Sequence, residues 1–409
     1  MKPLLWLLVF SLVALPAEAI ERRKKQFYDE ESHLILPLAY SIPGIGQGFM
    51  ATGLLGNIGG SYIDVYALAI TGDAVGNIAA IQEVHLIPEI LWVNYSVQNI
   101  SRAAVNIYEK RGMDTQKDEY RLVEVNKANY RMPLATLSFL ERRLEFTYMQ
   151  FTQDIAVTKF LTPKGDLISE FDPVYEFSNK STQVGVSVDY TDDRQDPRVG
   201  FRLAASKTQS PVTDQVQPEY YVISNSASIY LPLGSASTWA FNYYKSDAVV
   251  TKEGVTDENY IKAELGFNCA STDFACLAAE ASVVADYQAQ RRYGTAEALG
   301  GDRRLRAYPQ GRYQAAHTQY YATELRWSFD EKVTPFDFWI WKDVSTALQL
   351  ALFYEAGTVA ELKSDLGVIT RTSSGLGLRM VSASGFVYRA DYANGEEGGN
   401  MTLIFDYPW

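Results

Sequence analysis

The chain lacks the features that usually mark a soluble enzyme or a helical membrane protein. After Pro16, none of its apolar runs approaches the roughly 18 residues that would indicate a membrane-spanning helix. Its 3 histidines do not show the His-Glu-x-x-His spacing of a metal site. Neither a Gly-x-Ser-x-Gly nucleophile elbow nor a Gly-Lys-Ser/Thr phosphate loop occurs. We therefore expect a protein that is not an enzyme and that needs no cofactor and no metal.

Basic residues and cysteines are scarce as well. The 37 Lys and Arg are outnumbered by 49 Asp and Glu, which gives a formal net charge of −12. Because nucleic acids are bound through basic patches, we expect no nucleic-acid partner. Only Cys269 and Cys276 are present, so no framework of disulfides can hold the fold. Their spacing fits a disulfide across the short turn between them and fits two free thiols equally well.

The first nineteen residues have the composition of a secretory signal peptide. Lys2 supplies a positive start, residues 4–15 form an apolar stretch, and Ala17-Glu18-Ala19 offer a small-x-small cleavage site. The alternative, an uncleaved anchor helix, would need about 20 apolar residues. We expect residues 1–19 to be removed and the mature chain to act outside the cytoplasm.

Aromatic residues, by contrast, are abundant, with 27 Tyr, 19 Phe and 7 Trp. Apolar and polar residues alternate with a period of two in many segments, whereas a helix would repeat its apolar residues at spacings of three and four. The clearest segments are residues 91–97, 184–190, 261–267, 277–289, 321–327, 348–355 and 386–392. Each of them is predicted to be a β-strand.

Two features favour a membrane barrel over a soluble β-sandwich. Many positions on the polar faces are Ser, Asn, Gln, Gly or isolated charges, as expected of a water-filled barrel interior. Short turns, such as residues 192–197, alternate with longer polar loops, such as 207–219 and 252–259, which is the asymmetry of outer-membrane barrels. The predicted fold is all-β, a transmembrane antiparallel β-barrel. From residue 60 onward we count about sixteen strands, an even number, as single-chain bacterial barrels have.

The start of the barrel can be placed in more than one way. Residues 46–56 (GQGFMATGLLG) fit an additional strand, a shifted first strand or a segment that crosses the periplasmic mouth. We assign residues 20–45 to a short periplasmic lead-in and residues 46–409 to the outer-membrane barrel.

The end of the chain alternates and closes on an aromatic residue. In residues 401–409, the side chains of Leu403, Phe405, Tyr407 and Trp409 would face one way along a final strand. Pro408 is tolerable there because it sits at the strand end. Phe405, Tyr407 and Trp409 resemble the C-terminal signal by which outer-membrane barrels are recognised for insertion, so we expect the barrel assembly machinery to be a partner.

Four motifs, in order along the chain, resemble one known family. Residues 300–313 read GGDRRLRAYPQGRY, and Thr323-Glu324-Leu325-Arg326 follow. The other three motifs are DYTDDR at 189–194, FYEAGTV at 353–359 and SGLGLR at 374–379. Together they are similar to the BamA-like outer-membrane assembly-factor superfamily, also called the bacterial surface antigen family. The resemblance covers roughly residues 183–409.

The resemblance implies a lock between a loop and the barrel interior. In the family, an arginine of the sixth loop folds inside the barrel and pairs with acidic residues of two strands. Arg306, Tyr308, Glu324 and Glu355 occupy these places, and we call them the loop–lumen lock. Strand parity agrees, because outward-facing neighbours of Glu324 and Glu355 would turn both carboxylates into the lumen. An Arg fork can bind two carboxylates at once.

The chain departs from the family at two positions and in one segment. Ala307 replaces the usual glycine, and alanine tolerates fewer backbone conformations, so we expect a differently shaped loop tip. Glu355 replaces the usual aspartate and reaches one methylene further. Residues 20–41 leave no room for the polypeptide-transport-associated domains that usually precede such a barrel. We therefore expect a member of the family that consists of the barrel alone.

The function implied by the resemblance is transport or insertion of protein or lipid at the bacterial outer membrane. The expected partners are outer-membrane lipid, the barrel assembly machinery and an unidentified periplasmic protein. A passive solute pore and a structural surface protein are the alternatives, since sixteen strands can enclose an aqueous channel.

Two further expectations concern topology and the loop. If residues 261–267 and 277–289 are strands, Cys269 and Cys276 flank a periplasmic turn. Arg312, in the Gly-Arg-Tyr echo of the loop motif, is expected to contribute less than Arg306 and to serve as its control.

Overall fold

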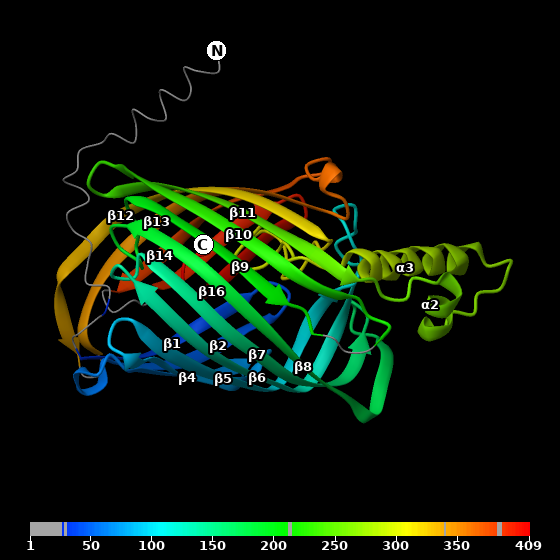
Figure 1. The fold of residues 1–409 in the computed structure, drawn as a ribbon, viewed down its shortest axis with the longest axis horizontal. Coiled ribbons are helices and arrows are strands. Elements are labelled where there is room, and N and C mark those ends of the chain that lie inside the picture. Colours follow the sequence, from blue (N-terminus) through cyan, green and yellow to red (C-terminus); the bar gives the residue numbers. More distant parts are fainter. Residues whose placement is uncertain (1–26, 28–30, 212–214, 339–340, 383–386) are drawn as a thin grey trace, which may run out of the picture.

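The computed structural model describes residue 27 and residues 31–211, 215–338, 341–382 and 387–409. Sixteen antiparallel strands close into one barrel, and each strand pairs with its neighbours in the sequence (Figure 1). The prediction of an all-β, sixteen-stranded antiparallel barrel is confirmed. The expected signal peptide, residues 1–19, lies outside the described residues.

The strands vary widely in length. They are β1 (Ser32–Ile42), β2 (Gly46–Gly56), β3 (Asp64–Gly72), β4 (Val75–Ile87), β5 (Leu91–Tyr108), β6 (Tyr120–Phe139), β7 (Leu144–Leu161), β8 (Leu167–Thr191), β9 (Gly200–Gln209), β10 (Glu219–Leu233), β11 (Ser237–Lys252), β12 (His317–Phe338), β13 (Trp341–Ala360), β14 (Arg371–Ser382), β15 (Val387–Gly395) and β16 (Gly398–Phe405). Two 3-10 turns, η2 (Ile58–Gly60) and η3 (Lys363–Asp365), lie between strands.

The barrel begins earlier in the chain than we expected. Residues 32–42, which we had assigned to a periplasmic lead-in, form β1, and every residue of β1 pairs with β2. The ambiguous segment 46–56 is β2, a full barrel strand. Fourteen strands, not sixteen, therefore lie beyond residue 60. The lead-in was misread because β1 contains Pro37 and a nearly continuous apolar run, so its alternation is weak.

Residues 261–267 and 277–289, predicted as strands, lie in a helical hairpin instead. The helices α2 (Glu258–Leu265) and α3 (Phe274–Tyr293) project from one end of the barrel (Figure 1). Asp257 and Asp273 cap their N-termini by accepting hydrogen bonds from the backbone N–H groups of Tyr260 and Cys276. α3 is rich in alanine and other strong helix formers, and this propensity prevails over the apparent alternation. Among the described residues, no helix combines the length and apolar character needed to cross a lipid bilayer.

The two ends of the barrel differ in what they carry. β1 begins and β16 ends at one end, which we call the proximal end. The opposite, distal end carries the connection between β11 and β12, residues 253–316, which contains both helices. The turn 192–199 is proximal and the connection 210–218 is distal, so the two lie at opposite ends as predicted, although they are nearly equal in length.

The outer surface of β11–β16 is an apolar row at one level of the barrel. Register pairs connect its members across six strands, and each side chain is at least one-third exposed: Trp239, Leu325, Leu352, Leu376, Tyr392 and Met401. Because successive side chains of a strand point to opposite faces, the neighbouring row faces inward. There Glu324, Arg326 and Glu355 are fully buried, as parity predicted.

Candidate functional site

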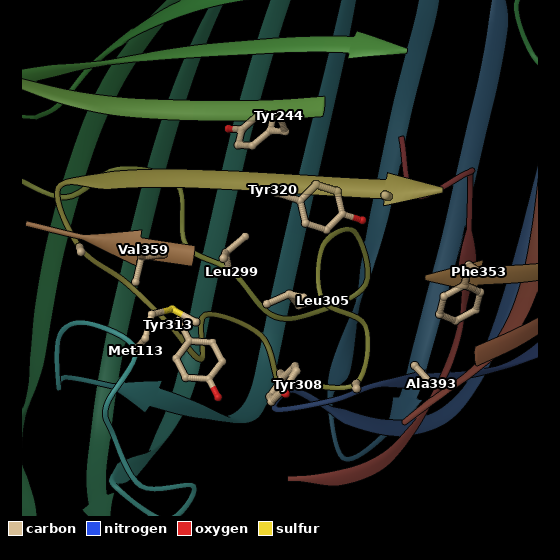
Figure 2. Close-up of a cluster of buried hydrophobic side chains, with 13 residues drawn as sticks. Met113, Tyr244, Leu299, Leu305, Tyr308, Tyr313, Tyr320, Phe353, Val359 and Ala393 are labelled. Atoms are coloured by element: carbon tan, nitrogen blue, oxygen red, sulfur yellow. The ribbon is translucent and has the colours of Figure 1, made fainter. Parts of the chain in front are cut away.

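The second half of the β11–β12 connection, residues 295–316, runs back into the barrel, and we call it the inner loop. Leu299, Leu305, Tyr308 and Tyr313 of this loop are fully buried against residues of the wall (Figure 2). Tyr320 of β12 and residues of β11, β13 and β15 complete this cluster. The inner loop therefore has a core of its own inside the lumen, which fixes the positions of its polar side chains.

Two glycines shape the inner loop. Gly300 and Gly301 adopt φ of +100° and +110°, and their N–H groups donate to Arg304 O and Tyr308 O. A side chain at Gly300 would meet Pro309 O at 2.1 Å. Both positions therefore require glycine. Ala307 is not among the residues with positive φ, so alanine fits where the family usually has glycine.

Arg306 is the centre of the deepest contact. Its backbone N–H donates to Glu355 Oε2 at 2.8 Å and its Nε to Glu355 Oε1 at 2.9 Å. Its two Nη atoms reach Asp391 Oδ2 at 2.6 Å and Glu324 Oε2 at 3.4 Å. The guanidinium carbon also lies 3.4 Å from the ring centre of Phe353. The structure thus brings Arg306 together with both carboxylates named from the sequence, and it adds a third.

Three more arginines surround these carboxylates. Arg326 Nε donates to Glu324 Oε1 at 2.7 Å, and Arg379 binds both oxygens of Glu324. Arg389 Nη1 donates to Asp391 Oδ2 at 2.6 Å. All of these side chains are fully buried, so each charge depends on its partners. Removing one partner of such a cluster leaves a charge without compensation, which costs far more than breaking a surface ion pair.

The charge of Arg306 is secured by its neighbours. Burial alone would lower the pKa of its guanidinium, but the carboxylates of Glu355, Asp391 and Glu324 raise that pKa well above its usual value. Arg306 is therefore a permanent cation, and the inner loop is held by charge-assisted hydrogen bonds.

Tyr308, the remaining member of the loop–lumen lock, contacts the distal ends of two strands. Its hydroxyl donates to Thr372 O in β14 and accepts from the Glu396 N–H group that follows β15, both at 3.2 Å. All four lock residues therefore lie where the inner loop contacts β12–β15. That they hold the loop in place stays a prediction.

Arg312 forms a second anchor, which the sequence reading undervalued. It is 1% exposed, and its Nη2 donates to Glu397 Oε1 at 2.6 Å and to Thr115 O at 2.7 Å. It therefore ties the inner loop to the β5–β6 connection and to the β15–β16 turn. Because Arg312 is so extensively bonded, its removal should itself be destabilising; that it contributes less than Arg306 stays a prediction.

The C-terminal residues do not continue the last strand. β16 ends at Phe405, and Asp406 adopts a φ of +67°. The hydroxyl of Tyr407 then lies 2.7 Å from Asp196 Oδ1, and the guanidinium carbon of Arg326 lies 4.2 Å from the ring centre of Tyr407. Trp409 packs against the cluster around the inner loop. The expectation that Phe405, Tyr407 and Trp409 face one way along a strand was wrong, and whether they form an insertion signal stays untested.

The closing ladder between β1 and β16 is short. Within the described strands, these two share one register pair, Ser41 and Leu403, whereas β1 and β2 pair throughout. Near its start, β1 pairs instead with the first two residues of β13. Two side chains add to the seam: Ser41 Oγ donates to Met401 O at 3.0 Å, and the Tyr388 hydroxyl donates to Ala39 O at 2.8 Å.

Cys269, in the connection between α2 and α3, forms a disulfide with Cys276 in the first turn of α3. The sequence left open a disulfide and two free thiols, and the structure has the disulfide. The predicted turn between two strands is wrong, because both residues belong to the helical hairpin at the distal end, on the connection that also carries the inner loop. That they face the periplasm stays a prediction.

The sequence reading missed the members of the cluster that come from β14 and β15. Arg379 belongs to the SGLGLR motif, and Arg389 and Asp391 alternate with apolar residues in β15. Their parity could have marked them as lumen residues, but nothing local says which lumen charges meet. The described part of the chain holds no group of three or more His, Cys, Asp or Glu side chains suited to a metal ion.

Among the comparisons with known proteins, only the comparison with solved structures gives matches. No family model matches the chain, and no curated protein matches it. The chain is similar to the structure of BamA from Haemophilus ducreyi lacking POTRA domains 1-3, at 10% identity and a TM-score of 0.48, over 92% of this chain and 70% of that one. It is also similar to CdiB from Escherichia coli (11% identity, TM-score 0.49, 96% and 62% coverage) and to CdiB from Acinetobacter baumannii (10%, 0.48, 92% and 60%). The chain thus spans less than two thirds of the two CdiB chains.

Proposed function

We propose that this chain is a bacterial outer-membrane barrel that assists the insertion or passage of polypeptide or lipid through its lumen and its β1–β16 seam. The inner loop carries the proposal. It occupies the lumen instead of lying over the distal mouth, and the buried contacts of Arg306 fix it to β12, β13 and β15. The four motifs that resemble the BamA-like superfamily lead to the same function.

The seam gives the proposed activity a route. A single register pair joins β1 to β16, so fewer backbone hydrogen bonds must break there than between other neighbouring strands. An opened seam exposes two strand edges, and such edges are templates for pairing with another chain. An incoming strand could pair with them while the loop–lumen lock preserves the rest of the barrel.

The test is an assisted-folding assay in phosphatidylcholine vesicles. The reconstituted barrel should accelerate the insertion of a small, urea-denatured outer-membrane barrel. In a background with Cys269→Ser and Cys276→Ser, the pair Ser41→Cys and Leu403→Cys would lock the seam by a disulfide. We expect the locked barrel to lose the acceleration and to regain it on reduction.

A matched control places a disulfide between two strands that already pair along their full length. The pair Ala39→Cys and Phe49→Cys joins β1 to β2 at a register pair and should leave the acceleration unchanged. If the wild-type barrel gives no acceleration, or the seam lock has no effect, the proposal is wrong. A steady ion conductance that neither lock alters would favour a passive pore instead.

A further inference from the structure

Across β4–β8, one stretch of the wall reverses the polarity found in β11–β16. One row across these five strands is polar and faces outward: Asn77, Asn99, Asn129, Asp154 and Ser178. The adjacent row has no polar side chain and faces the lumen: Gly76, Ile100, Ala128, Ile155 and Phe177. A water-filled lumen would favour the opposite arrangement. The inner wall here is therefore suited to contact with an apolar partner.

A cavity of about 950 Å³ lies against this wall. Side chains of β4–β8, including Ile100, Val125, Ala128 and Val157, line one side of it, and Arg303 of the inner loop lies on its border. This volume is near the upper end of the roughly 300–1,000 Å³ typical of small-molecule sites. The sequence reading had expected many polar positions in the lumen, and this part of the inner wall departs from that expectation.

The charges at the border of the cavity are unequally satisfied. Glu83 is paired with Arg142, and Glu109 with Arg121, each at 2.6 Å. Arg303 is held less firmly, since its Nε lies 4.0 Å from Asp302 Oδ2 and its side chain is 67% exposed. Asp302 and Asp406 also line the cavity. A cation that is accessible inside the lumen therefore borders the apolar wall.

A second, polar cavity continues on the other side of Arg303. It has a volume of about 430 Å³ and is lined by Arg303, Arg304, Glu297, Ser206 and Gln183. The lumen thus offers an apolar compartment, an accessible cation at its border, and a polar compartment beyond it. A molecule that complements this order has an apolar chain and an anionic head group.

We propose that the lumen binds an anionic amphiphile of the fatty-acid type, with its alkyl chain on the inner wall of β4–β8 and its acid group on Arg303. An apolar polypeptide would bring backbone N–H and C=O groups against the inward row around Ile100, Ala128 and Ile155, whose side chains offer no hydrogen-bond partner, and unpaired groups of this kind are costly. An alkyl chain carries none. The proposal is independent of the seam and would stand if the barrel assists no insertion.

Photo-crosslinking in phosphatidylcholine nanodiscs tests the proposal. Palmitic acid with a diazirine near its methyl end is the probe, and hexadecanol with the same diazirine is the uncharged analogue. Mass spectrometry locates the labelled residues. We expect the acid to label the inner wall around Ile100, Ala128 and Ile155 more than the alcohol does. Both probes should label the outer row around Leu352, which serves as an internal reference.

Three variants separate the parts of the site. Arg303→Gln should lower inner-wall labelling by the acid about tenfold, the change that about 1.4 kcal/mol produces, and should leave labelling by the alcohol unchanged. Ala128→Trp should fill the cavity and abolish inner-wall labelling by both probes; Val157→Phe serves if the first variant does not fold. Arg292→Gln, on the exposed face of α3, is the matched control and should change nothing.

Three results would overturn the proposal. The first is labelling confined to the outer row. The second is inner-wall labelling by the acid that Arg303→Gln leaves unchanged. The third is labelling of the inner wall by an apolar peptide carrying the same diazirine when palmitic acid gives none, which would assign the cavity to a polypeptide. Heat-dependent mobility in SDS shows that each variant is folded before it is labelled.

Discussion

In β11–β16 an outward row is apolar and buried charges face inward, whereas in β4–β8 an outward row is polar and the inward row beside it is apolar. The first arrangement places Leu352 outside and Glu324, Glu355 and Asp391 inside, where Arg306 of the inner loop and arginines of β12, β14 and β15 neutralise them. The second places Asn129 outside and leaves Ala128 and its neighbours facing a cavity. In one half of the barrel, the inner loop of the same chain covers the inner wall. In the other half, an apolar inner wall faces a cavity.

Strand length accompanies the difference. β5–β8 have 18, 20, 18 and 25 residues, well beyond the roughly 9–11 that cross a bilayer. A good part of each of these strands would therefore stand in water, where an outward polar row is favourable. The comparison teaches that the alternation of a strand reports which faces are apolar and does not report which of them meets lipid.

Arg306→Ala should have the largest effect, because it removes the residue at the centre of the buried charge cluster inside β11–β16. Glu355 would keep the Tyr320 hydroxyl, 2.7 Å away, and would lose its cation. Breaking a buried pair typically costs about 3–5 kcal/mol. Urea unfolding in vesicles and proteolysis of residues 301–315 measure the loss. Arg306→Lys should restore only part of it, since an ammonium group cannot fork between carboxylates.

A double variant sharpens this result. Adding Glu355→Ala to Arg306→Ala removes the uncompensated carboxylate and should recover part of the stability. Arg292→Ala replaces Arg312→Ala as the control and should change the unfolding free energy little, since Arg292 is half-exposed. An inner loop that is equally resistant to protease in the wild type and in Arg306→Ala would refute the loop–lumen lock.

The next largest effect is expected of a lysine placed on the outer surface, which should distinguish β11–β16 from β4–β8. Leu352→Lys puts a charge in the apolar row and should cost about 2–4 kcal/mol if that row faces the bilayer midplane. Asn129→Lys puts the same charge in the polar row and should stay within about 0.5 kcal/mol, as surface changes usually do. Unfolding of the two variants in the same vesicles gives the comparison. Equal costs would show that both rows meet the same medium.

Arg312→Ala should destabilise the protein less than Arg306→Ala but clearly. It removes charge-assisted hydrogen bonds to Glu397 and Thr115 at the distal rim. A hydrogen bond to a charged group contributes about 1.5–3 kcal/mol. Glu397 is partly exposed and can be rehydrated, which limits the loss. The distal part of the inner loop should become sensitive to protease while residues near Arg306 stay protected. Cleavage at both places would mean that the two anchors act as one.

Tyr407→Phe should have a small effect on the same half. The variant keeps the ring beside Arg326 and removes the hydrogen bond to Asp196, a loss of about 0.5–1.5 kcal/mol. A larger effect is expected of Tyr407→Ala, which also removes the aromatic face. If the two variants unfold alike, the ring contributes nothing and the cation–π contact is not significant.

Breaking the disulfide should have the smallest effect on the barrel. Cys269 and Cys276 close a short loop in the helical hairpin, outside the wall. Cys269→Ser with Cys276→Ser should leave the unfolding of the barrel unchanged and increase proteolysis of α2 and α3. In intact cells, an impermeant thiol reagent should label both cysteines after reduction if the distal end faces outward. Labelling only after the outer membrane is permeabilised would invert this topology.

The sequence predicted the parts of the fold that depend on local pattern. Alternation identified strands such as residues 91–97 and 348–355, because the period of two follows from the pleat itself. The same signal failed in 277–289, where alanine-rich sequence and an N-cap at Asp273 make a helix. It also failed in β1, whose apolar run hides the alternation.

What the sequence determined by itself was the class of fold and the parity of β12 and β13, which puts Glu324 and Glu355 in the lumen. Only the tertiary structure decided which charges meet, because Arg306, Glu355 and Asp391 come from a loop and two strands up to 85 residues apart. It also decided that Tyr407 turns inward, through one residue with positive φ, and that the inner wall of β4–β8 is left apolar. Parity places a side chain on a face; closure of the barrel decides what that face meets.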